Sequence, residues 1–410
     1  MLDAKTMKIV KSTVPVLEKE GERITTRFYE LLFQKYPELL NVFNHANQKK
    51  GRQQTALANA VYAAAAHIDQ LEKILLAVRQ IAHKHRSLGV KPEHYPLVGE
   101  TLLEAIGDVL DLEEDSEIIT AWAVAYQAIA DAFIGVEKEM YAEAAEQTGG
   151  WEGFREFVVD QKVEESEVIT SFYLKPKDGG AIASYTPGQY ISVKLNIPGE
   201  AHTHIRQYSL SDAPGKDYYR LSVKREDENV PQGKISVYLH RGIKEGDVLS
   251  LSAPAGDFTL DQTSRKPVVL LSGGVGLTPL VSMVSTIVEE QPGREVTFIH
   301  AARNGNVHAL RDEVAKIAEE NASVRFYVCY DSPTDEDRER KRYDKEGYVT
   351  EAWLRSIVPN LDADYYFCGP EPFMRAMNHV LQEMKIPEEQ IHYEFFGPSI
   401  DLRARETVRA

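Results

Sequence analysis

Two kinds of hydrophobic pattern divide the chain near residue 150. Before this point, Ala, Leu, Glu and Lys recur at helical spacing, whereas residues 190–195 and 220–224 alternate apolar and polar side chains. A period of 3.6 predicts helices that bury one face, and a period of two predicts strands. Residues 1–147 are therefore predicted to form an all-α domain of about seven helices. The glycine-rich segment 148–153 is predicted to be a short linker.

A second change of pattern falls near residues 264–267. Beyond it, short apolar runs alternate with helical stretches, which predicts a parallel α/β sheet over residues 264–410. The segment between the two changes is rich in strands and turns, so residues 152–263 are predicted to form an antiparallel β-barrel. The sequence thus predicts a multidomain protein with an all-α part, an antiparallel barrel and a parallel α/β part.

Composition narrows the classes of protein. A length of 410 residues predicts two to three domains, and a net charge of −16 gives no basic field for nucleic acid or anionic lipid. No uninterrupted apolar run approaches the roughly 18 residues of a membrane helix, and the charged N-terminus does not resemble a secretory signal. Cys329 and Cys368 stand in apolar stretches and are predicted to be buried thiols in a reducing cytoplasm.

One histidine falls on the buried face of a predicted helix. His85 follows Ile81 by four residues and Val78 by seven, so it shares their apolar face. A buried histidine must satisfy its ring nitrogens. The pattern alone leaves two interpretations open: a core histidine bonded to a backbone carbonyl, or the axial ligand of a buried metal or haem.

Four further residues accompany this histidine in the first part. Tyr29 lies in an earlier predicted helix, Phe43 follows a proline break, and Gln53 and Leu57 share a helix face four residues apart. Each residue taken alone is equally well explained as a core or surface side chain. Together they add weight to the interpretation of His85 as an axial ligand.

A short strand in the middle part combines an arginine, a tyrosine and a serine. The segment is Arg206, Gln207, Tyr208 and Ser209. Its arginine and tyrosine are two residues apart and face the same side of a strand. The alternatives are a strand with polar ends and a flavin clamp, in which the arginine holds a phosphate, the ring stacks on the isoalloxazine and the serine bonds the flavin edge. Further on, Gly233 and Ser236 open a predicted helix whose N-terminus suits a pyrophosphate.

The last part opens on an apolar strand that runs directly into a glycine-rich turn. The turn and the start of the next helix contain Gly273, Gly274, Val275, Gly276, Thr278 and Pro279. Glycines let the backbone approach a phosphate, and the helix N-terminus faces it. The spacing Gly-Gly-x-Gly-x-x-Pro departs from the Gly-x-Gly-x-x-Gly of ordinary dehydrogenases. A second strand ends in a tight turn at Cys368, Gly369 and Pro370.

Together these motifs resemble one known family over nearly the whole chain. Residues 1–147 are similar to a bacterial single-chain globin, most plainly in segments 43–48 and 81–85. The middle and last parts resemble the FAD- and NAD(P)-binding halves of the ferredoxin–NADP reductase superfamily. A globin joined to such a reductase resembles the flavohaemoglobins, the nitric oxide dioxygenases.

The resemblance implies one haem b in the first part. His85 matches the proximal iron ligand, and Tyr95 and Glu137 match the pair that orients its ring. A carboxylate in this position favours oxygen chemistry over storage. On the other side of the haem, Tyr29, Gln53 and Leu57 match two hydrogen-bond donors to bound dioxygen and a residue that restricts access.

The resemblance likewise implies one FAD and a site for NAD(P)H. Tyr190 matches a flavin contact, and Gly233 and Ser236 match the diphosphate site. The glycine-rich turn matches the NAD(P) loop, and the turn at Cys368 matches a position near the nicotinamide. The segment that returns to the flavin contains Phe395, Phe396, Gly397 and Pro398.

Three charged residues keep two interpretations each. Glu394 matches a residue between flavin and haem, and Lys84 matches its counterpart on the globin side, so an ion pair and a solvated side chain are alternatives. Arg303, after the second parallel strand, either meets the 2′-phosphate of NADPH or is a surface arginine. The choice between NADH and NADPH stays open.

The activity implied by the resemblance is nitric oxide detoxification. NAD(P)H electrons pass via FAD to the haem, which, with O2 bound, converts NO to nitrate. The small-molecule partners are NO and O2, with no nucleic acid and no required protein partner, and lipid in the haem pocket stays open. The alternatives are a haem-based O2 or NO sensor or carrier whose reductase keeps the iron ferrous, and a flavin reductase with a vestigial globin.

Overall fold

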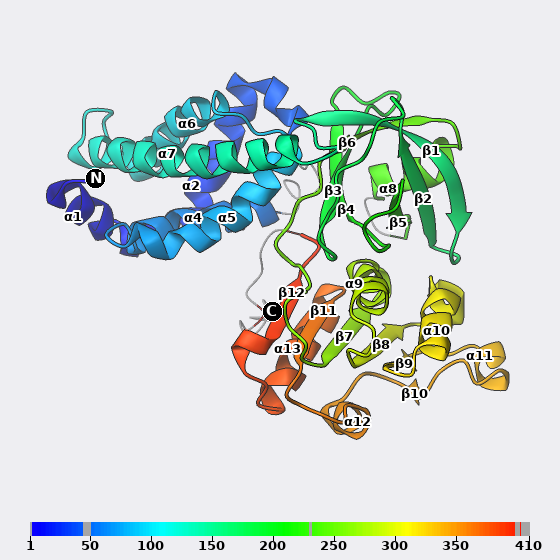
Figure 1. Cartoon of the computed structure of the whole chain (residues 1–410). Helices are drawn as coiled ribbons and strands as arrows, with labels where there is room; N and C mark the ends of the chain where they lie inside the picture. The colour runs from blue at the N-terminus through cyan, green and yellow to red at the C-terminus, as the bar shows by residue number, and fades with distance from the viewer. Residues whose placement is uncertain (1, 44–50, 229–231, 398–401, 403–410) are drawn as a thin grey trace. The chain divides into compact units, whose positions relative to one another are not determined.

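The computed structural model describes residues 2–43, 51–228, 232–397 and 402 (Figure 1). The chain forms two compact units. The first contains residues 1–155, 192–206 and 250–255, and the second contains residues 156–191, 207–249 and 256–410. The units therefore do not follow chain order, because two short segments of the middle part belong with the N-terminal helices.

The N-terminal part is helical, as its pattern predicts. Its helices are α1 (Ala4–Ser12), α2 (Val14–Lys35), the 3₁₀ turn η1 (Pro37–Asn41), α4 (Arg52–Ala66), α5 (Leu71–Leu88), α6 (His94–Leu110) and α7 (Glu117–Glu146). Asp3 and Ser116 cap α1 and α7, because their side chains accept backbone N–H bonds of the first turn. Helix α5 ends at Gly89, whose φ of 78° is the left-handed conformation that terminates many helices.

Helix α7 is long and apolar enough to cross a membrane by length and composition alone. The prediction concerned uninterrupted apolar runs, and polar residues such as Gln127 and Asp131 interrupt this helix, so α7 does not contradict it. A buried core helix passes the same test. Ile119, Trp122 and Ala125 of α7 lie in the apolar core that the helices share, together with Phe28 of α2.

The middle part is an antiparallel sheet, as predicted. Its strands are β1 (Phe154–Glu164), β2 (Ile169–Pro176), β3 (Tyr190–Leu195), β4 (His204–Ser209), β5 (Tyr219–Lys224) and β6 (Val248–Ser252), with helix α8 (Lys234–Gly242) between the last two. The strand order is β4-β3-β6-β1-β2-β5, and an antiparallel bridge joins Leu210, after β4, to Leu221 of β5. This bridge connects the two edge strands and closes the sheet into a barrel.

The C-terminal part is a parallel sheet with connecting helices. Its strands are β7 (Val268–Gly273), β8 (Val296–Ala302), β9 (Val324–Tyr330), β10 (Lys345–Glu346), β11 (Asp364–Cys368) and β12 (Ile391–Glu394). Its helices are α9 (Leu277–Glu290), α10 (Arg311–Glu320), α11 (Asp335–Glu339), α12 (Glu351–Ile357) and α13 (Glu371–Glu383), with 3₁₀ turns η2 (Gly274–Gly276), η3 (Gly305–Val307) and η4 (Glu388–Gln390). The order β10-β9-β8-β7-β11-β12 reverses direction between β7 and β11. In open α/β sheets, ligands bind at this reversal, beyond the carboxyl ends of the strands.

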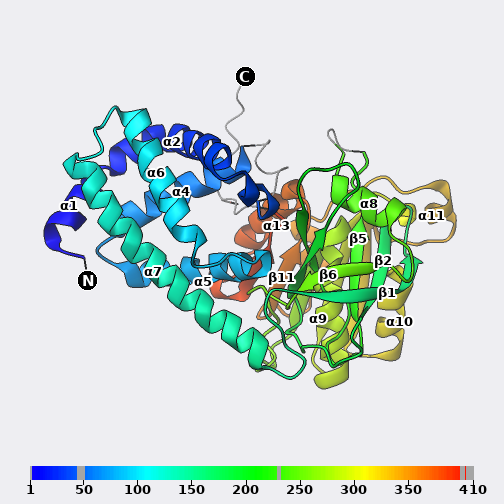
Figure 2. The same ribbon diagram turned by 90° about the horizontal axis from the view of Figure 1, so that it is seen from above.

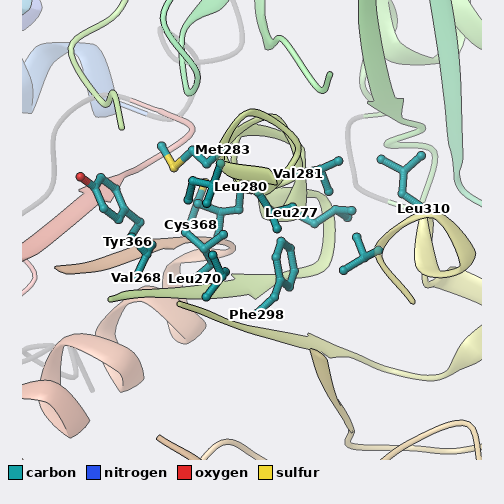
Figure 3. Packing of buried hydrophobic residues seen from close by; sticks show 14 of the residues in the cluster. Val268, Leu270, Leu277, Leu280, Val281, Met283, Phe298, Leu310, Tyr366 and Cys368 are labelled. Carbon is teal, nitrogen blue, oxygen red and sulfur yellow. The ribbon is translucent and has the colours of Figure 1, made fainter. Parts of the chain in front are cut away.

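Strand β7 is buried on both faces. Val268 and Leu270 pack with α9 and with Phe298 of β8 (Figure 3), whereas Val269 and Leu271 pack with α12 and α13. Successive side chains of a strand point to opposite faces, so α9 and α10 cover one face of the sheet and α12 and α13 cover the other (Figure 1). Figure 2 shows the same chain turned by 90°. The continuous apolar run of β7 follows from this double burial.

Two histidines are buried side by side, His300 on β8 and His308 directly after η3. The ring centroids of His300 and His308 are 4.1 Å apart, and both side chains are buried. Nδ1 of His300 lies 2.7 Å from the Ser272 hydroxyl, and Nδ1 of His308 lies 2.8 Å from the Tyr330 hydroxyl. Burial lowers the pKa of His300 to about 3, and burial with the neighbouring His300 lowers the pKa of His308 well below its usual value. Both rings are therefore uncharged at neutral pH.

Acid should destabilise the parallel sheet through these histidines. Below a pH of about 6.5 the unfolded chain binds a proton at each ring while the folded chain does not, so the free energy of unfolding falls by about 1.4 kcal/mol per pH unit for each histidine. We expect the double substitution His300→Asn and His308→Asn to remove about 2.7 kcal/mol per pH unit of this slope. Pulse proteolysis in urea at several pH values measures this slope when the cleavage of peptides from β7 to β9 is followed.

The exposed His379 of α13 provides the control, because its substitution by Asn should leave the slope unchanged. An unaltered slope in the double variant would show that the buried pair takes up protons in the folded protein.

Candidate functional site

Three side chains from three helices meet at His85. His85 lies in the last turn of α5, Tyr95 in the first turn of α6 and Glu137 in the C-terminal part of α7. Glu137 Oε1 is 2.8 Å from His85 Nδ1 and accepts a hydrogen bond from the Tyr95 hydroxyl at 2.6 Å. The Tyr95 oxygen is 3.2 Å from the same nitrogen. Packing of α7 against α5 and α6 thus gathers residues that lie 42 and 52 positions apart.

This geometry fixes the tautomer of His85. A carboxylate only accepts hydrogen bonds, so Nδ1 donates to Glu137 and Nε2 keeps a lone pair. Within the described part of the chain, no hydrogen bond engages Nε2, and the side chain is 31 % exposed. The partner of His85 is a carboxylate rather than a backbone carbonyl. An imidazole held in this way is the form that ligates metals, so the site fits a haem iron.

The surroundings hold Glu137 and Tyr95 in place. Glu137 is 3 % exposed, and a buried charge needs donors, which His85 and Tyr95 supply. Burial and the bond to Glu137 raise the pKa of Tyr95 well above its usual value, so Tyr95 keeps the proton that it donates. The ring centroid of Phe133 lies 5.7 Å from that of His85. The sequence reading missed Phe133, although it precedes Glu137 by one helical turn on the same face.

The opposite side of the expected pocket involves α2 and α4, which pack together. Tyr29 is buried, and its ring centroid lies 5.8 Å from that of Phe33 and 5.9 Å from that of Phe43. Leu57 packs against the same cluster, and Gln53 lies half-buried in the first turn of α4. The structure therefore places Tyr29, Phe43 and Leu57 in or against one apolar cluster, with the rings of Tyr29 and Phe43 in contact. Residues 44–48, which carry part of the resemblance, lie outside the described residues, and the donor roles of Tyr29 and Gln53 stay predictions.

Strand β4 carries the predicted flavin segment. Arg206 and Tyr208 are half-buried and alternate with Gln207 along the strand, and Ser209 is buried. Tyr190 begins β3, the strand next to β4 in the barrel. The predicted flavin contacts at Tyr190, Arg206, Tyr208 and Ser209 thus lie on two neighbouring strands. Their contacts with FAD stay predictions.

The predicted diphosphate helix begins where expected, with Gly233 as the residue that precedes α8. The hydroxyl of Ser236 is buried and accepts a hydrogen bond from the backbone N–H of Glu226 at 3.2 Å. The same hydroxyl lies 3.2 Å from the carbonyl oxygen of Gly233. Here Ser236 closes a turn between β5 and α8, and its contact with a diphosphate stays a prediction.

The two glycine-containing turns lie against each other. The first follows β7 and the second follows β11, which is the neighbour of β7. A Cβ on Gly276 would lie 2.2 Å from the carbonyl oxygen of Cys368, and a Cβ on Gly369 would lie 3.1 Å from Cα of Gly273. Both turns therefore stand at the reversal of strand order, where a dinucleotide binds in such sheets. The first turn continues into α9, whose opening turn contains Thr278 and Pro279.

The C-terminal segment lies beside the second turn. Strand β12 pairs in parallel with β11, and Glu394 stands in register with Cys368. Phe395, Phe396 and Gly397 follow directly, whereas Pro398 lies outside the described residues.

The roles predicted for the charged residues Lys84, Glu394 and Arg303 stay predictions. Lys84 lies half-buried in α5, in the first unit, and Glu394 belongs to the second, so their ion pair stays a prediction. The side chain of Arg303 is 53 % exposed and lies 3.6 Å from Glu228. That pair is a surface contact, and the choice between NADH and NADPH stays open.

The folds and sites define a class of protein, in which a globin is joined to an FAD- and NAD(P)-binding reductase. Family models match the chain in three places: globin at residues 26–133, oxidoreductase FAD-binding domain at 156–260 and oxidoreductase NAD-binding domain at 270–379. The chain is 58 % identical over 404 residues to the flavohaemoprotein of Bacillus thuringiensis subsp. konkukian, which covers 98 % of this chain and 100 % of the relative. The chain therefore belongs to the flavohaemoprotein family.

Solved structures agree with this assignment. The crystal structure of the flavohaemoglobin of Malassezia yamatoensis with bound FAD and haem matches 97 % of this chain and 100 % of its own, with a TM-score of 0.83 and 27 % identity. The FAD/NAD-binding domain of a nitric oxide dioxygenase from Vibrio cholerae matches 60 % of this chain and 99 % of its own, with a TM-score of 0.55 and 36 % identity. The predicted fold class and the cofactors haem, FAD and NAD(P)H are confirmed. The domain boundaries 1–147, 152–263 and 264–410 stay a prediction.

Substitution of Glu137 by Gln should weaken the electron donation of His85. The amide keeps the shape of the side chain but loses the charge that polarises the Nδ1–H bond. We expect the iron–histidine stretching frequency to fall and the haem midpoint potential to rise. The turnover of the haem site in the presence of NAD(P)H and O2 should drop about 10- to 100-fold. Resonance Raman spectroscopy and potentiometric titration measure these effects.

The matched control is Glu139→Gln, an exposed position of the same helix. An unchanged stretching frequency in Glu137→Gln would mean that the carboxylate does not act on the ring of His85.

Proposed function

We propose that this chain is a nitric oxide dioxygenase that converts NO and O2 to nitrate with electrons from NAD(P)H. Its membership of the flavohaemoprotein family, with FAD- and NAD-binding domains, makes it an NAD(P)H-driven haem oxidoreductase. The conversion of NO and O2 to nitrate is the part of this function that we propose. The observation that carries it is the hydrogen-bonded set of His85, Glu137 and Tyr95. A buried carboxylate on Nδ1 makes the imidazole a stronger electron donor, which suits oxygen activation more than reversible storage.

The residues of the chain have distinct roles in this proposal. When bound, FAD accepts two electrons from NAD(P)H and releases them singly, and haem supplies an iron that binds O2. His85 would hold the iron through Nε2, while Glu137 keeps the proton on Nδ1. Tyr29 and Gln53 supply an O–H and an N–H donor for a diatomic ligand, and Leu57 restricts access to it.

The reductase side follows from the two adjacent turns. Backbone N–H groups at Gly274 to Gly276 and the N-terminus of α9 provide donors for a pyrophosphate. The turn at Cys368 to Pro370 lies against them and faces the position proposed for the nicotinamide. Arg206 and Tyr208 on β4 are the proposed phosphate and ring contacts of FAD.

Several observations support this proposal. The Vibrio cholerae protein whose reductase domain is similar to this chain is named a nitric oxide dioxygenase. A globin part is suited to small gases such as O2 and NO, and the presence of both modules in one chain supports a reaction without a protein partner. Cys329 and Cys368 are free and buried, which supports a reducing compartment such as the cytoplasm.

An assay of NO loss by haem- and FAD-replete protein tests the proposal. We expect continuing NO consumption that needs both NAD(P)H and O2, with two NO, two O2 and one NAD(P)H giving two nitrate, one NAD(P)⁺ and one proton. A sensor or carrier would bind NO once per haem and then stop. NO binding without continuing turnover, or turnover without nitrate, would overturn the proposal.

A further inference from the structure

A buried arginine joins the barrel to a helix of the nucleotide-binding sheet. Arg220 lies on β5 and is 3 % exposed. Its Nη1 and Nη2 donate to the two carboxylate oxygens of Glu313 at 2.7 and 2.8 Å. Glu313 stands in the first turn of α10, and both residues belong to the second unit. The pair therefore has the two-pronged geometry that fixes orientation as well as distance.

The guanidinium is also tied to the barrel beside it. Nη2 donates a second hydrogen bond to the carbonyl oxygen of Ser211, and Nε lies 4.0 Å from the Asp212 carboxylate. Asp212 in turn accepts a hydrogen bond from the Tyr218 hydroxyl at 2.8 Å. Both ends of the Arg220 fork therefore hold Glu313 of α10, while Nη2 and Nε also anchor the same guanidinium in the barrel.

A pair of this kind contributes more to geometry than to stability. Removing both ions from water costs about as much as their attraction returns, so apolar replacements of a buried pair are often neutral. A planar fork on a carboxylate, however, permits one relative orientation of the two groups. The surface pair between Lys216 and Glu289, at 2.8 Å with both side chains partly exposed, lacks this restriction.

The Arg220–Glu313 pair is connected to the glycine-rich turn on both sides of the contact. Strand β5 packs against η2, the glycine-rich turn after β7. Helix α10 begins directly after the loop that follows β8, the strand next to β7. The Arg220–Glu313 pair therefore holds the sheet at α10 while the same strand of the barrel contacts the glycine-rich turn.

We propose that Arg220 and Glu313 are positioning residues for hydride transfer. They hold the glycine-rich turn after β7 in a fixed position relative to the flavin-binding barrel. In this transfer the C4–H bond of the dihydronicotinamide breaks and its hydrogen forms an N–H bond at N5 of the flavin. Both bonding electrons move with it, so the nicotinamide is oxidised and the flavin is reduced by two electrons. The inference rests on the NAD(P)H–FAD half of the proposed function and is independent of the reaction with NO.

Anaerobic stopped-flow mixing of the full FAD-loaded chain with NAD(P)H tests the inference. We expect Glu313→Gln to lower the limiting rate of flavin bleaching by about 10- to 100-fold, because small misplacements of reacting groups have effects of this size. The FAD content and the flavin midpoint potential should stay at their wild-type values. Glu289→Gln, which removes the exposed pair, should change the rate by less than about twofold.

Two further variants separate geometry from folding. Arg220→Lys keeps the charge but loses the fork, so it should also slow the limiting rate. The double variant Arg220→Met and Glu313→Met removes both charges, and we expect it to fold yet to transfer slowly. The inference is overturned if Glu313→Gln and Arg220→Lys both keep the wild-type limiting rate, or if each loses rate only in proportion to lost FAD. Failure of the wild-type chain to bleach its flavin with NAD(P)H would instead contradict the reductase half of the proposed function.

Discussion

His85→Ala is expected to abolish NO consumption while leaving the reductase intact. His85 is the residue whose Nε2 faces no partner among the described residues and whose Nδ1 is bound by Glu137. Alanine removes the only imidazole that this arrangement prepares for the iron. We expect haem content to fall strongly and NO turnover to drop by at least about 100-fold, since the ligand sets both retention and reactivity of the iron. Reduction of FAD by NAD(P)H should stay within about twofold of wild type, because Arg206, Tyr208 and the nucleotide turns are unchanged.

The helix that carries His85 also offers a control. His83 lies two residues earlier and therefore points to a different side of α5, so His83→Ala should retain haem and NO turnover. Haem content from the pyridine haemochrome spectrum and NO loss at an electrode measure both variants. Undiminished NO turnover in His85→Ala would show that the globin part is not the site of the reaction. That result would favour the alternative of a flavin reductase with a vestigial globin.

Gly276→Ala is expected to have the second large effect, on the nucleotide side. An added Cβ would lie 2.2 Å from the carbonyl oxygen of Cys368 and 2.6 Å from the backbone nitrogen of Gly369. Both atoms are backbone, so one of the two turns must move. The neighbouring Gly274 is required for another reason, since its φ of 53° is left-handed while its surroundings are open. We expect NAD(P)H-driven reduction of the flavin to slow by at least about 100-fold, with FAD still bound.

A chemical reductant distinguishes this defect from general unfolding. Dithionite should still reduce FAD and haem in Gly276→Ala, because the barrel and the helical part are unaffected. Gly135→Ala in α7 is the matched control, since no atom lies within 4 Å of its added Cβ. A normal rate of flavin reduction by NAD(P)H in Gly276→Ala would show that the contact between the turns has no part in nucleotide binding.

Periodicity predicts much of the fold because each element buries one face or two. The helical spacing of Val78, Ile81 and His85 and the apolar run of β7 are local patterns, and both elements form as predicted. The glycine-rich turn was also predictable, because strand, glycines and helix start are consecutive. A search for uninterrupted apolar runs does not single out α7, because polar residues interrupt a helix that is apolar on average.

Local sequence patterns do not predict which distant side chains contact each other in the folded protein. Glu137 stands 52 residues from His85, and periodicity gives no reason to join them, so the pair came from a family resemblance. Arg220 was missed because β5 alternates polar and apolar residues, which predicts a half-exposed strand. In the structure all of β5 except its last residue is buried, and its polar side chains enter an internal hydrogen-bonded cluster.

The central claim is that one chain carries electrons from NAD(P)H through FAD to an iron that binds gases. Its most direct test is an absorption spectrum of the purified, haem- and FAD-replete chain, followed by anaerobic mixing with NAD(P)H in the presence of carbon monoxide. We expect the flavin to bleach and the haem band to shift to the ferrous–carbon monoxide form with NAD(P)H as the only reductant. Flavin bleaching with no change in the haem band would contradict the claim, because it would show that electrons reach the flavin and stop there.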